Sequence, residues 1–202
     1  MKSQVVYKHD VHFTVTLIPA QDVTNLEVSI YAKPKQQHQT LVTRADVDPV
    51  TGVLEGEIDN LKRETTVRAV WDGDAAAGYP DAYEAKSVVE VKVDLRGHMK
   101  KFASKDGKYF VYEPGTKVFI KVTVVPGKAG ETITFRYDRL VQGEWELLGH
   151  AKVPISNGGV TAYIAPSNLD AGSRYRIKAK HDGDDDLFLV GDQTPYFYFK
   201  VE

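Results

Sequence analysis

The sequence predicts an all-β chain that contains two tandem copies of one β-sandwich domain. Three observations support this: an internal repeat, apolar residues at every second position in many short segments, and the lack of an amphipathic helical pattern. The repeat is clearest at an Asp-Gly-Asp stretch, which occurs at 72–74 and again at 182–184. In both places it follows an expected strand and precedes a loop and a closing strand. A chain of 202 residues has room for two domains of ordinary size.

The expected strands come in the same order in both halves of the chain. Phe13 aligns with Ile120 at a spacing of 107 residues (120 − 13), and Leu26 aligns with Ile133 at the same spacing. Between the two Asp-Gly-Asp stretches the spacing has grown only to 110 residues (182 − 72). Because such a repeat defines the architecture, we expect two domains of the same topology.

In the first half, apolar side chains alternate with polar ones. Val11, Phe13, Val15 and Leu17 are separated by polar residues, which is the pattern of a strand with one buried face. Further strands are expected at 26–30, 41–43, 53–58, 65–71 and 87–93, with a long loop at 72–83. No window has the apolar spacing and caps of a helix, so we expect almost no helix.

The second half repeats this plan. Strands are expected at 109–112, 118–124, 133–137, 145–148, 160–164, 175–179 and 196–201. Turn signals such as Gln142-Gly143 and the 156–159 stretch separate them. About seven short strands per half, with turns every 8 to 12 residues, are typical of an immunoglobulin-like sandwich.

The boundary between the two domains is expected after residue 96. From Asp94 to Gly107 the sequence is basic, contains glycine and shows no alternation, so few buried contacts should cross it. We therefore predict domain 1 at 1–96, a linker at 97–107 and domain 2 at 108–202. Gly97-His98-Met99 also matches the kind of sequence that a cloning junction leaves.

The composition excludes several kinds of site and partner. The chain has no cysteine, so neither a disulfide framework nor a thiolate zinc site is possible. Its 26 basic and 28 acidic residues give a net charge near −2, which provides no strong field for nucleic acid or acidic lipid. We expect no nucleic-acid partner and a monomeric chain.

The sequence also bears on location. It has no apolar stretch typical of a signal peptide and no run of about 18 apolar residues, so we expect no membrane insertion. An extracellular or cell-surface location is expected only as part of a larger protein, and a cytoplasmic location is left open.

Several stretches of the second half resemble a known family. They are the Gly-Gly-Val-Thr-Ala-Tyr strand at 158–163, the Leu-Asp-Ala-Gly-Ser-Arg-Tyr segment at 169–175, and the closing strand at 197–201. Together they are similar to the bacterial Ig-like repeat domains found in tandem in large surface, secreted and phage-tail proteins. The resemblance implies a spacer, adhesion or ligand-display role and no catalytic residues. It also implies that Tyr175 closes a tyrosine corner, whereas residues 61–67 of the first half contain neither the Gly nor the Tyr.

The acidic loop of the second half is the candidate metal site. Asp182, Asp184, Asp186 and Asp192 offer the carboxylate oxygens that Ca²⁺ prefers, and the loop begins like an EF-hand. However, Leu187 stands where an EF-hand needs Gly, and Gln193 stands where it needs Glu. The residues therefore leave two alternatives: a weak Ca²⁺ site, or a turn in which Asp side chains accept backbone hydrogen bonds.

No pattern in the sequence indicates catalysis. The six histidines are scattered, and His9 and His12 would lie on opposite faces of an extended chain. Neither a nucleophile elbow nor a phosphate-binding glycine motif occurs. We expect a protein that is not an enzyme and has no cofactor, apart from the Ca²⁺ considered above.

The aromatic residues support two interpretations. The four consecutive aromatics at 196–199 must alternate between the two faces of a strand, so the outward pair is available for stacking on a sugar ring or on a neighbouring domain. Trp71 and Trp145 are expected in or near the core. If both are buried, a ligand platform loses most of its support.

The sequence therefore predicts a non-catalytic structural, adhesive or interaction module within a larger bacterial surface, secreted or phage-associated protein. Its partners would be other domains of that protein, or a protein or glycan ligand. The alternative is a carbohydrate- or ligand-binding accessory module attached to an enzyme or toxin. Exposed aromatics on one sheet face would favour the alternative, and a uniformly charged face would favour a spacer.

Overall fold

The computed structural model describes residues 2–18 and 22–202. In this part of the chain the structure is all-β, with strands in several sheets and no α-helix. The short 3₁₀ turns η2 (Ala75–Ala77) and η3 (Pro166–Asn168) interrupt the loops. Neither has the length or the apolar character needed to cross a membrane.

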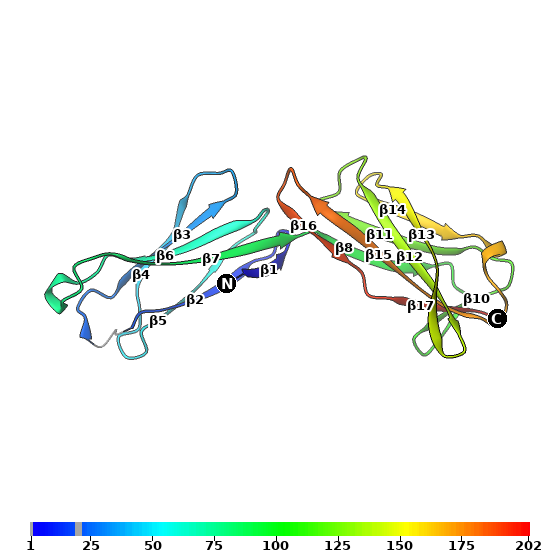
Figure 1. Cartoon of the computed structure of the whole chain (residues 1–202), viewed down its shortest axis with the longest axis horizontal. Helices are drawn as coiled ribbons and strands as arrows, with labels where there is room; N and C mark the ends of the chain where they lie inside the picture. Colours follow the sequence, from blue (N-terminus) through cyan, green and yellow to red (C-terminus); the bar gives the residue numbers. More distant parts are fainter. Residues whose placement is uncertain (1, 19–21) are drawn as a thin grey trace. The chain divides into compact units, whose positions relative to one another are not determined.

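The chain folds into two compact units (Figure 1). Unit 1 contains Met1–Lys92 together with Asp184–Val190, and unit 2 contains Val93–Gly183 together with Gly191–Glu202. The division after Lys92 differs from the predicted linker at 97–107. Residues 94–100 form strand β8 (Asp94–Lys100) and residues 104–106 form β9 (Ser104–Asp106), and both belong to unit 2. Gly97 interrupts the apolar alternation of β8, which hides the strand in the sequence.

Unit 1 contains two sheets. In the larger sheet the strands have the order β4-β3-β6-β7, and β1 pairs with β7 in parallel. The smaller sheet is the antiparallel pair β2-β5. The strands are β1 (Lys2–Val6), β2 (Val11–Thr16), β3 (Glu27–Pro34), β4 (Thr40–Asp46), β5 (Val53–Ile58), β6 (Thr65–Trp71) and β7 (Tyr83–Lys92). The start of β16 (Leu189–Gln193) adds a short parallel pairing to β7.

Unit 2 also contains two groups of strands. One has the order β13-β12-β15-β17-β10-β9, and the other has the order β14-β11-β8. The strands are β10 (Tyr109–Tyr112), β11 (Val118–Val125), β12 (Thr132–Val141), β13 (Glu144–Pro154), β14 (Gly159–Ile164), β15 (Arg174–Asp184) and β17 (Phe197–Val201), besides β8 and β9.

The strand pairings confirm the internal repeat. The hairpin β3-β4 corresponds to β12-β13, and the antiparallel pair β2-β5 corresponds to β11-β14. The parallel pair β1-β7 corresponds to β10-β17, and β3-β6 corresponds to β12-β15. The two units differ at one edge: β8 pairs with β11, whereas the equivalent edge of β2 has no partner strand among the described residues.

The two cores show the alternation that the sequence predicts. In unit 2, every second residue of β11 is buried, and Val122 and Val124 are 0% and 2% exposed. In unit 1, Ile30, Val47 and Trp71 belong to the buried cluster. The apolar residues of β2 are only half-buried, although they align with those of β11.

Candidate functional site

The first Asp-Gly-Asp stretch folds into a turn around the Asp74 side chain. Its Oδ1 accepts hydrogen bonds from the backbone N–H groups of Ala76 and Ala77, at 3.1 and 3.2 Å. Its Oδ2 accepts from the N–H of Asn25 and from the N–H and hydroxyl of Thr24, at 2.6 to 3.0 Å. The Asn25 and Thr24 bonds hold the pKa of Asp74 far below its usual value. Asp74 thus connects two loops of unit 1.

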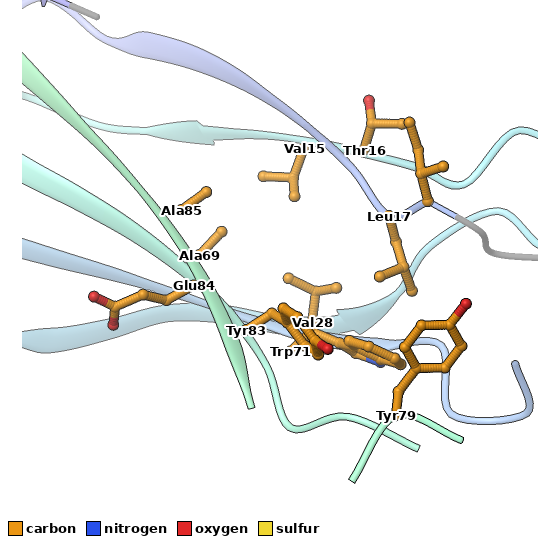
Figure 2. A pocket seen from close by; sticks show the side chains of 11 residues that line it. Val15, Thr16, Leu17, Val28, Ala69, Trp71, Tyr79, Tyr83, Glu84 and Ala85 are labelled. Atoms are coloured by element: carbon orange, nitrogen blue, oxygen red, sulfur yellow. The ribbon is translucent and has the colours of Figure 1, made fainter. Parts of the chain in front are cut away.

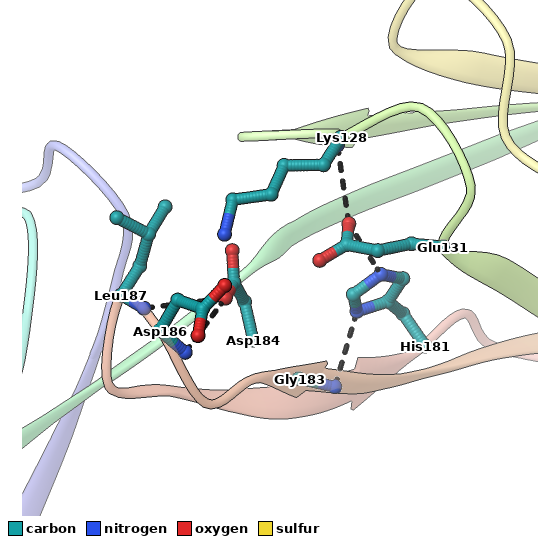
Figure 3. Close-up of polar contacts among 7 residues, drawn as sticks. All are labelled: Lys128, Glu131, His181, Gly183, Asp184, Asp186 and Leu187. Carbon is teal, nitrogen blue, oxygen red and sulfur yellow. Dashed lines mark hydrogen bonds and ion pairs between the residues drawn. The ribbon is translucent and has the colours of Figure 1, made fainter.

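The second stretch folds in the same way around Asp184. Its Oδ1 accepts hydrogen bonds from the N–H groups of Asp186 and Leu187, two and three residues further on, as Asp74 does (Figure 3). The turn, one of the two alternatives, is therefore present at both stretches. Both copies use the third residue of the Asp-Gly-Asp stretch.

The remaining predicted metal ligands differ in their exposure to solvent. Asp182 is exposed and forms an ion pair with Lys180 at 2.7 Å, which holds the pKa of Asp182 below its usual value. Asp186 is exposed and Asp192 is half-buried. Calcium binding by Asp182, Asp184, Asp186 and Asp192 stays a prediction.

A different group of carboxylates does converge in unit 1. Asp10, Glu57 and Asp59 are exposed, and their carboxylate oxygens lie within 4.8 Å of one another. The Asp10 carboxylate also accepts a hydrogen bond from the N–H of Asn60 at 2.8 Å, so it has a role in the turn. No sequence pattern indicates this cluster, because β5 lies more than 40 positions from Asp10.

Tyr175 has the geometry of a tyrosine corner. The side chain is fully buried, and its hydroxyl accepts a hydrogen bond from the N–H of Asp170, five residues upstream, at 2.6 Å. The ring stacks on Phe199 at a centroid distance of 5.1 Å. In unit 1 the equivalent position is Thr65, whose hydroxyl donates to the carbonyl of Arg63 at 2.9 Å. At this position unit 1 therefore has the hydrogen bond of the Thr65 hydroxyl in place of the tyrosine corner.

His181 is a buried structural residue of unit 2 (Figure 3). Its Nδ1 accepts a hydrogen bond from the N–H of Gly183 at 3.1 Å, so Nε2 carries the ring proton and faces Glu131 at 3.3 Å. Glu131 also accepts from the N–H of Lys128 at 3.1 Å. The histidine is thus held by hydrogen bonds within the fold.

The outward side of the larger sheet of unit 2 carries an aromatic–cationic strip. We define it by the half-buried rings of Tyr109, Trp145, Tyr196 and Tyr198 and the cations beside them. Trp145 and Tyr198 are 5.7 Å apart, and Tyr196 and Tyr198 are 6.5 Å apart. As predicted, the aromatics at 196–199 alternate: Phe199 is buried and Phe197 packs against Gly97 on the core side.

Positive side chains lie over the rings of this strip. The Arg176 guanidinium is 4.1 Å from the Tyr196 ring and 4.8 Å from the Trp145 ring. Lys108 is 4.3 Å from the Tyr198 ring. Further contacts join Lys178 to Tyr196 and Arg174 to Tyr109. These distances are in the range of cation–π interactions, so the rings and charges form one surface.

The carboxylate of Asp138 holds two arginine side chains in place. It is fully buried and binds Arg136 at 2.9 Å and Arg176 at 2.7 Å. Burial acts to raise the pKa of Asp138, but the hydrogen bonds from the two arginines outweigh it and hold the pKa below its usual value. Asp138 is therefore ionised at neutral pH and fixes the Arg176 guanidinium beside Trp145.

Unit 1 has an apolar cavity of about 310 Å³ (Figure 2). Val15 and Leu17 of the β2 segment lie on one side of it, and Val28, Ala69 and Trp71 lie on the other. Tyr79 and Tyr83 stand at its rim, each 5.8 Å from the Trp71 ring. Trp71 is buried as predicted, and its indole N–H donates to the carbonyl of Asn25 at 2.7 Å.

The comparisons with known proteins give structural matches alone. No protein-family model and no curated protein matches the chain. Among solved structures, the chain is similar to a mutant of Salmonella alpha-2-macroglobulin, with 11% identity and a TM-score of 0.36 over 98% of this chain and 14% of that chain. It is also similar to Escherichia coli alpha-2-macroglobulin activated by porcine elastase, with 11% identity and a TM-score of 0.38 over 100% of this chain and 19% of that chain. The chain spans less than a fifth of the length of these solved chains.

Proposed function

We propose that the chain is a non-catalytic interaction module, built from two Ig-like β-sandwiches in series, within a larger bacterial surface or secreted protein. The Ig-like assignment is supported by the two sheets of each unit and by the parallel pairs β1-β7 and β10-β17, in which an early strand of each unit pairs with a late one. The tyrosine corner at Tyr175 supports it for unit 2.

The aromatic–cationic strip carries the proposal of a ligand. Flat rings at the surface stack on the apolar faces of sugar rings, and arginine side chains bind carboxylate or sulfate groups. The strip presents both kinds of group within a few ångströms, with Arg176 held rigid by Asp138. An acidic polysaccharide is the ligand that uses both kinds of group, whereas a neutral glycan would use the rings alone.

Binding to a glycan array, followed by calorimetry with an acidic and a neutral oligosaccharide, tests this proposal. We expect binding to the acidic sugar, reduced about tenfold, or about 1.4 kcal/mol, by Tyr196→Ala or Trp145→Ala. Tyr163→Ala is the matched control, because Tyr163 is an exposed tyrosine on β14, outside the strip. A single-stranded oligonucleotide belongs in the same titration, since rings and cations also bind nucleic acid.

The result decides between an adhesive role and a spacer. Binding of the acidic glycan that the strip variants weaken, and the control does not, supports the proposal. Equal binding by all variants places the ligand elsewhere, and preference for the oligonucleotide replaces the ligand class. If nothing binds, a structural spacer between other domains becomes the better interpretation of the two sandwiches.

Calcium binding by the acidic loop is tested separately. Thermal unfolding with chelator and with millimolar Ca²⁺ is compared for the native protein and for Asp186→Asn. A calcium-dependent rise of the midpoint that the variant loses would support a site, since a ligand that binds only the folded state stabilises it. Identical midpoints would leave the Asp184 turn as the role of this loop.

A further inference from the structure

The two units differ in how the edge of one strand is covered. In unit 2, β8 pairs antiparallel with β11 over seven residue pairs, from Asp94 opposite Val125 to Lys100 opposite Phe119. In unit 1, β2 is equivalent to β11 and pairs with β5, but its other edge has no partner strand in residues 2–18 and 22–202. A free strand edge offers unpaired N–H and C=O groups to another extended chain.

The burial of the core reflects this difference. The strand β8 contributes Leu95 and Met99 to the core of unit 2, and both are nearly inaccessible to solvent. Under this cover, the inward apolar residues of β11, among them Ile120 and Val122, are buried. The equivalent residues of β2, among them Phe13 and Val15, are only half-buried. Among residues 2–18 and 22–92, unit 1 thus has no counterpart of the apolar side chains that β8 contributes to unit 2.

The cavity lies where these side chains are missing. It is bounded by Val15 and Leu17, whose equivalents in unit 2, Val122 and Val124, face Gly97 and Leu95 of β8. Its opposite wall, including Ala69 and Trp71, is apolar (Figure 2). The free edge and the cavity therefore adjoin each other, as β-strand addition requires: backbone pairing at the edge and a pocket for alternate side chains.

We propose that the edge of β2 and the adjoining cavity of unit 1 bind an extended polypeptide strand, in the way that β11 binds β8. The strand runs antiparallel to β2 and follows the pattern apolar–x–small–x–apolar of Leu95, Gly97 and Met99. By the alignment of the two halves, its apolar residues lie opposite Leu17 and Phe13, and its small residue lies opposite Val15.

Charge supports the same occupant. The outward residues of β8 include Arg96, His98 and Lys100, which are exposed. The outward face of the β2-β5 sheet carries Glu55 and Glu57 on the strand next to β2, with Asp10 and Asp59 beside Glu57. A strand with basic outward side chains is therefore attracted to this face, and an acidic strand is repelled.

A synthetic peptide with the sequence of residues 93–100 is the probe. We expect it to bind the full chain in calorimetry and to slow hydrogen exchange at the amides of 11–17 by about tenfold or more at saturation. A peptide with Asp at the positions of Leu95 and Met99 keeps the backbone and loses the apolar anchors. Because the two apolar side chains lose their burial, its binding should be at least about tenfold weaker.

Protein variants locate the binding site. Val15→Arg places a charge in the cavity and should abolish peptide binding, whereas the neutral substitution Thr14→Gln lies on the outward face of the same strand and should not. The peptide pair leaves the protein unchanged, so it remains decisive if Val15→Arg fails to fold.

Three outcomes would overturn the proposal. One is the absence of binding, with unchanged exchange at 11–17. Another is protection of β11 or of the aromatic–cationic strip instead of β2. The third is concentration-dependent protection of β2 without peptide, which would make a second copy of the chain the occupant.

Discussion

The hydroxyl of Tyr175 fixes part of the loop before β15 by accepting a hydrogen bond from its backbone. Tyr175→Phe removes the acceptor of the Asp170 N–H and keeps the ring that stacks on Phe199. We expect unit 2 to lose about 1 to 2 kcal/mol of stability, because a shielded donor is left without its partner. Urea unfolding measures this loss. Tyr163→Phe, at an exposed position, should change stability by less than about 0.5 kcal/mol, and an equal effect of both variants would contradict the prediction.

Asp74 makes the stability of unit 1 depend on pH in the acid range. Its pKa in the folded state is far below the usual 3.8, chiefly because of the hydrogen bonds from Asn25 and Thr24. A carboxylate with a depressed folded pKa stabilises the fold above its unfolded pKa and loses that contribution as pH falls through the folded pKa. Unit 1 should therefore lose stability progressively below about pH 4.

The Asp74→Asn variant isolates this effect. It should be less stable than the native protein at pH 7 and should show a shallower decline of the unfolding midpoint between pH 4 and pH 2. Asp72→Asn, two residues away at an exposed position, is the control and should keep the native pH profile. Parallel profiles for the native protein and Asp74→Asn would show that the carboxylate does not set this dependence.

Single residues were predictable where their role is local. The tyrosine corner was implied by the family resemblance of the segment from Leu169 to Tyr175, and the Asp turns depend on bonds to residues two and three positions away. The aromatic–cationic strip was foreseen only in its Tyr196 and Tyr198 part. Its other members come from β10, β13 and β15, and no sequence spacing relates Arg176 to Trp145.

Among the elements, β8 gives the clearest prediction about the stability of unit 2. Its Leu95 side chain is buried in unit 2, although the residue precedes the predicted linker. Leu95→Ala should therefore destabilise unit 2 by about 2 to 5 kcal/mol, through lost burial and the cavity that remains. Hydrogen exchange should accelerate at the amides of β11 and β12 and remain unchanged in β3 and β6. Acceleration confined to β3 and β6 would mean that Leu95 stabilises unit 1, as the predicted domain 1 at 1–96 implies.

Most strands were predictable because period-2 alternation is a local property. The strand β11 follows it over its whole length, and the repeat carried the same order to the other half. The strand β8 was not predicted, because Gly97 gives no apolar signal and because the outward residues of the strand are basic like those of a linker. The strand β8 belongs to unit 2 because it pairs with β11. This pairing is long-range, so no short window of the sequence contains it.

At the scale of the whole molecule, the repeat predicted two units. It did not predict that a segment of the second half would belong to unit 1. Residues 184–190 come from the second half and belong to unit 1. There, Leu189 pairs with Val91, the N–H of Glu64 donates to the carbonyl of Phe188 at 3.2 Å, and Lys35 lies 4.9 Å from the Phe188 ring. The acidic turn at Asp184 is the point at which the chain enters unit 1.

The assignment of residues 184–190 to unit 1 leads to a prediction opposite to the one that sequence order alone would give. Leu189 is buried, so Leu189→Ala should destabilise its unit by about 2 to 5 kcal/mol. Because its unit is unit 1, hydrogen exchange should accelerate in β3, β6 and β7, which lie about 100 or more positions upstream, and not in β11 and β12. Leu148→Ala, at a partly exposed position on β13, is the matched control and should leave unit 1 unchanged. Faster exchange in β11 and β12 alone would mean that residues 184–190 stabilise the half in which they are encoded.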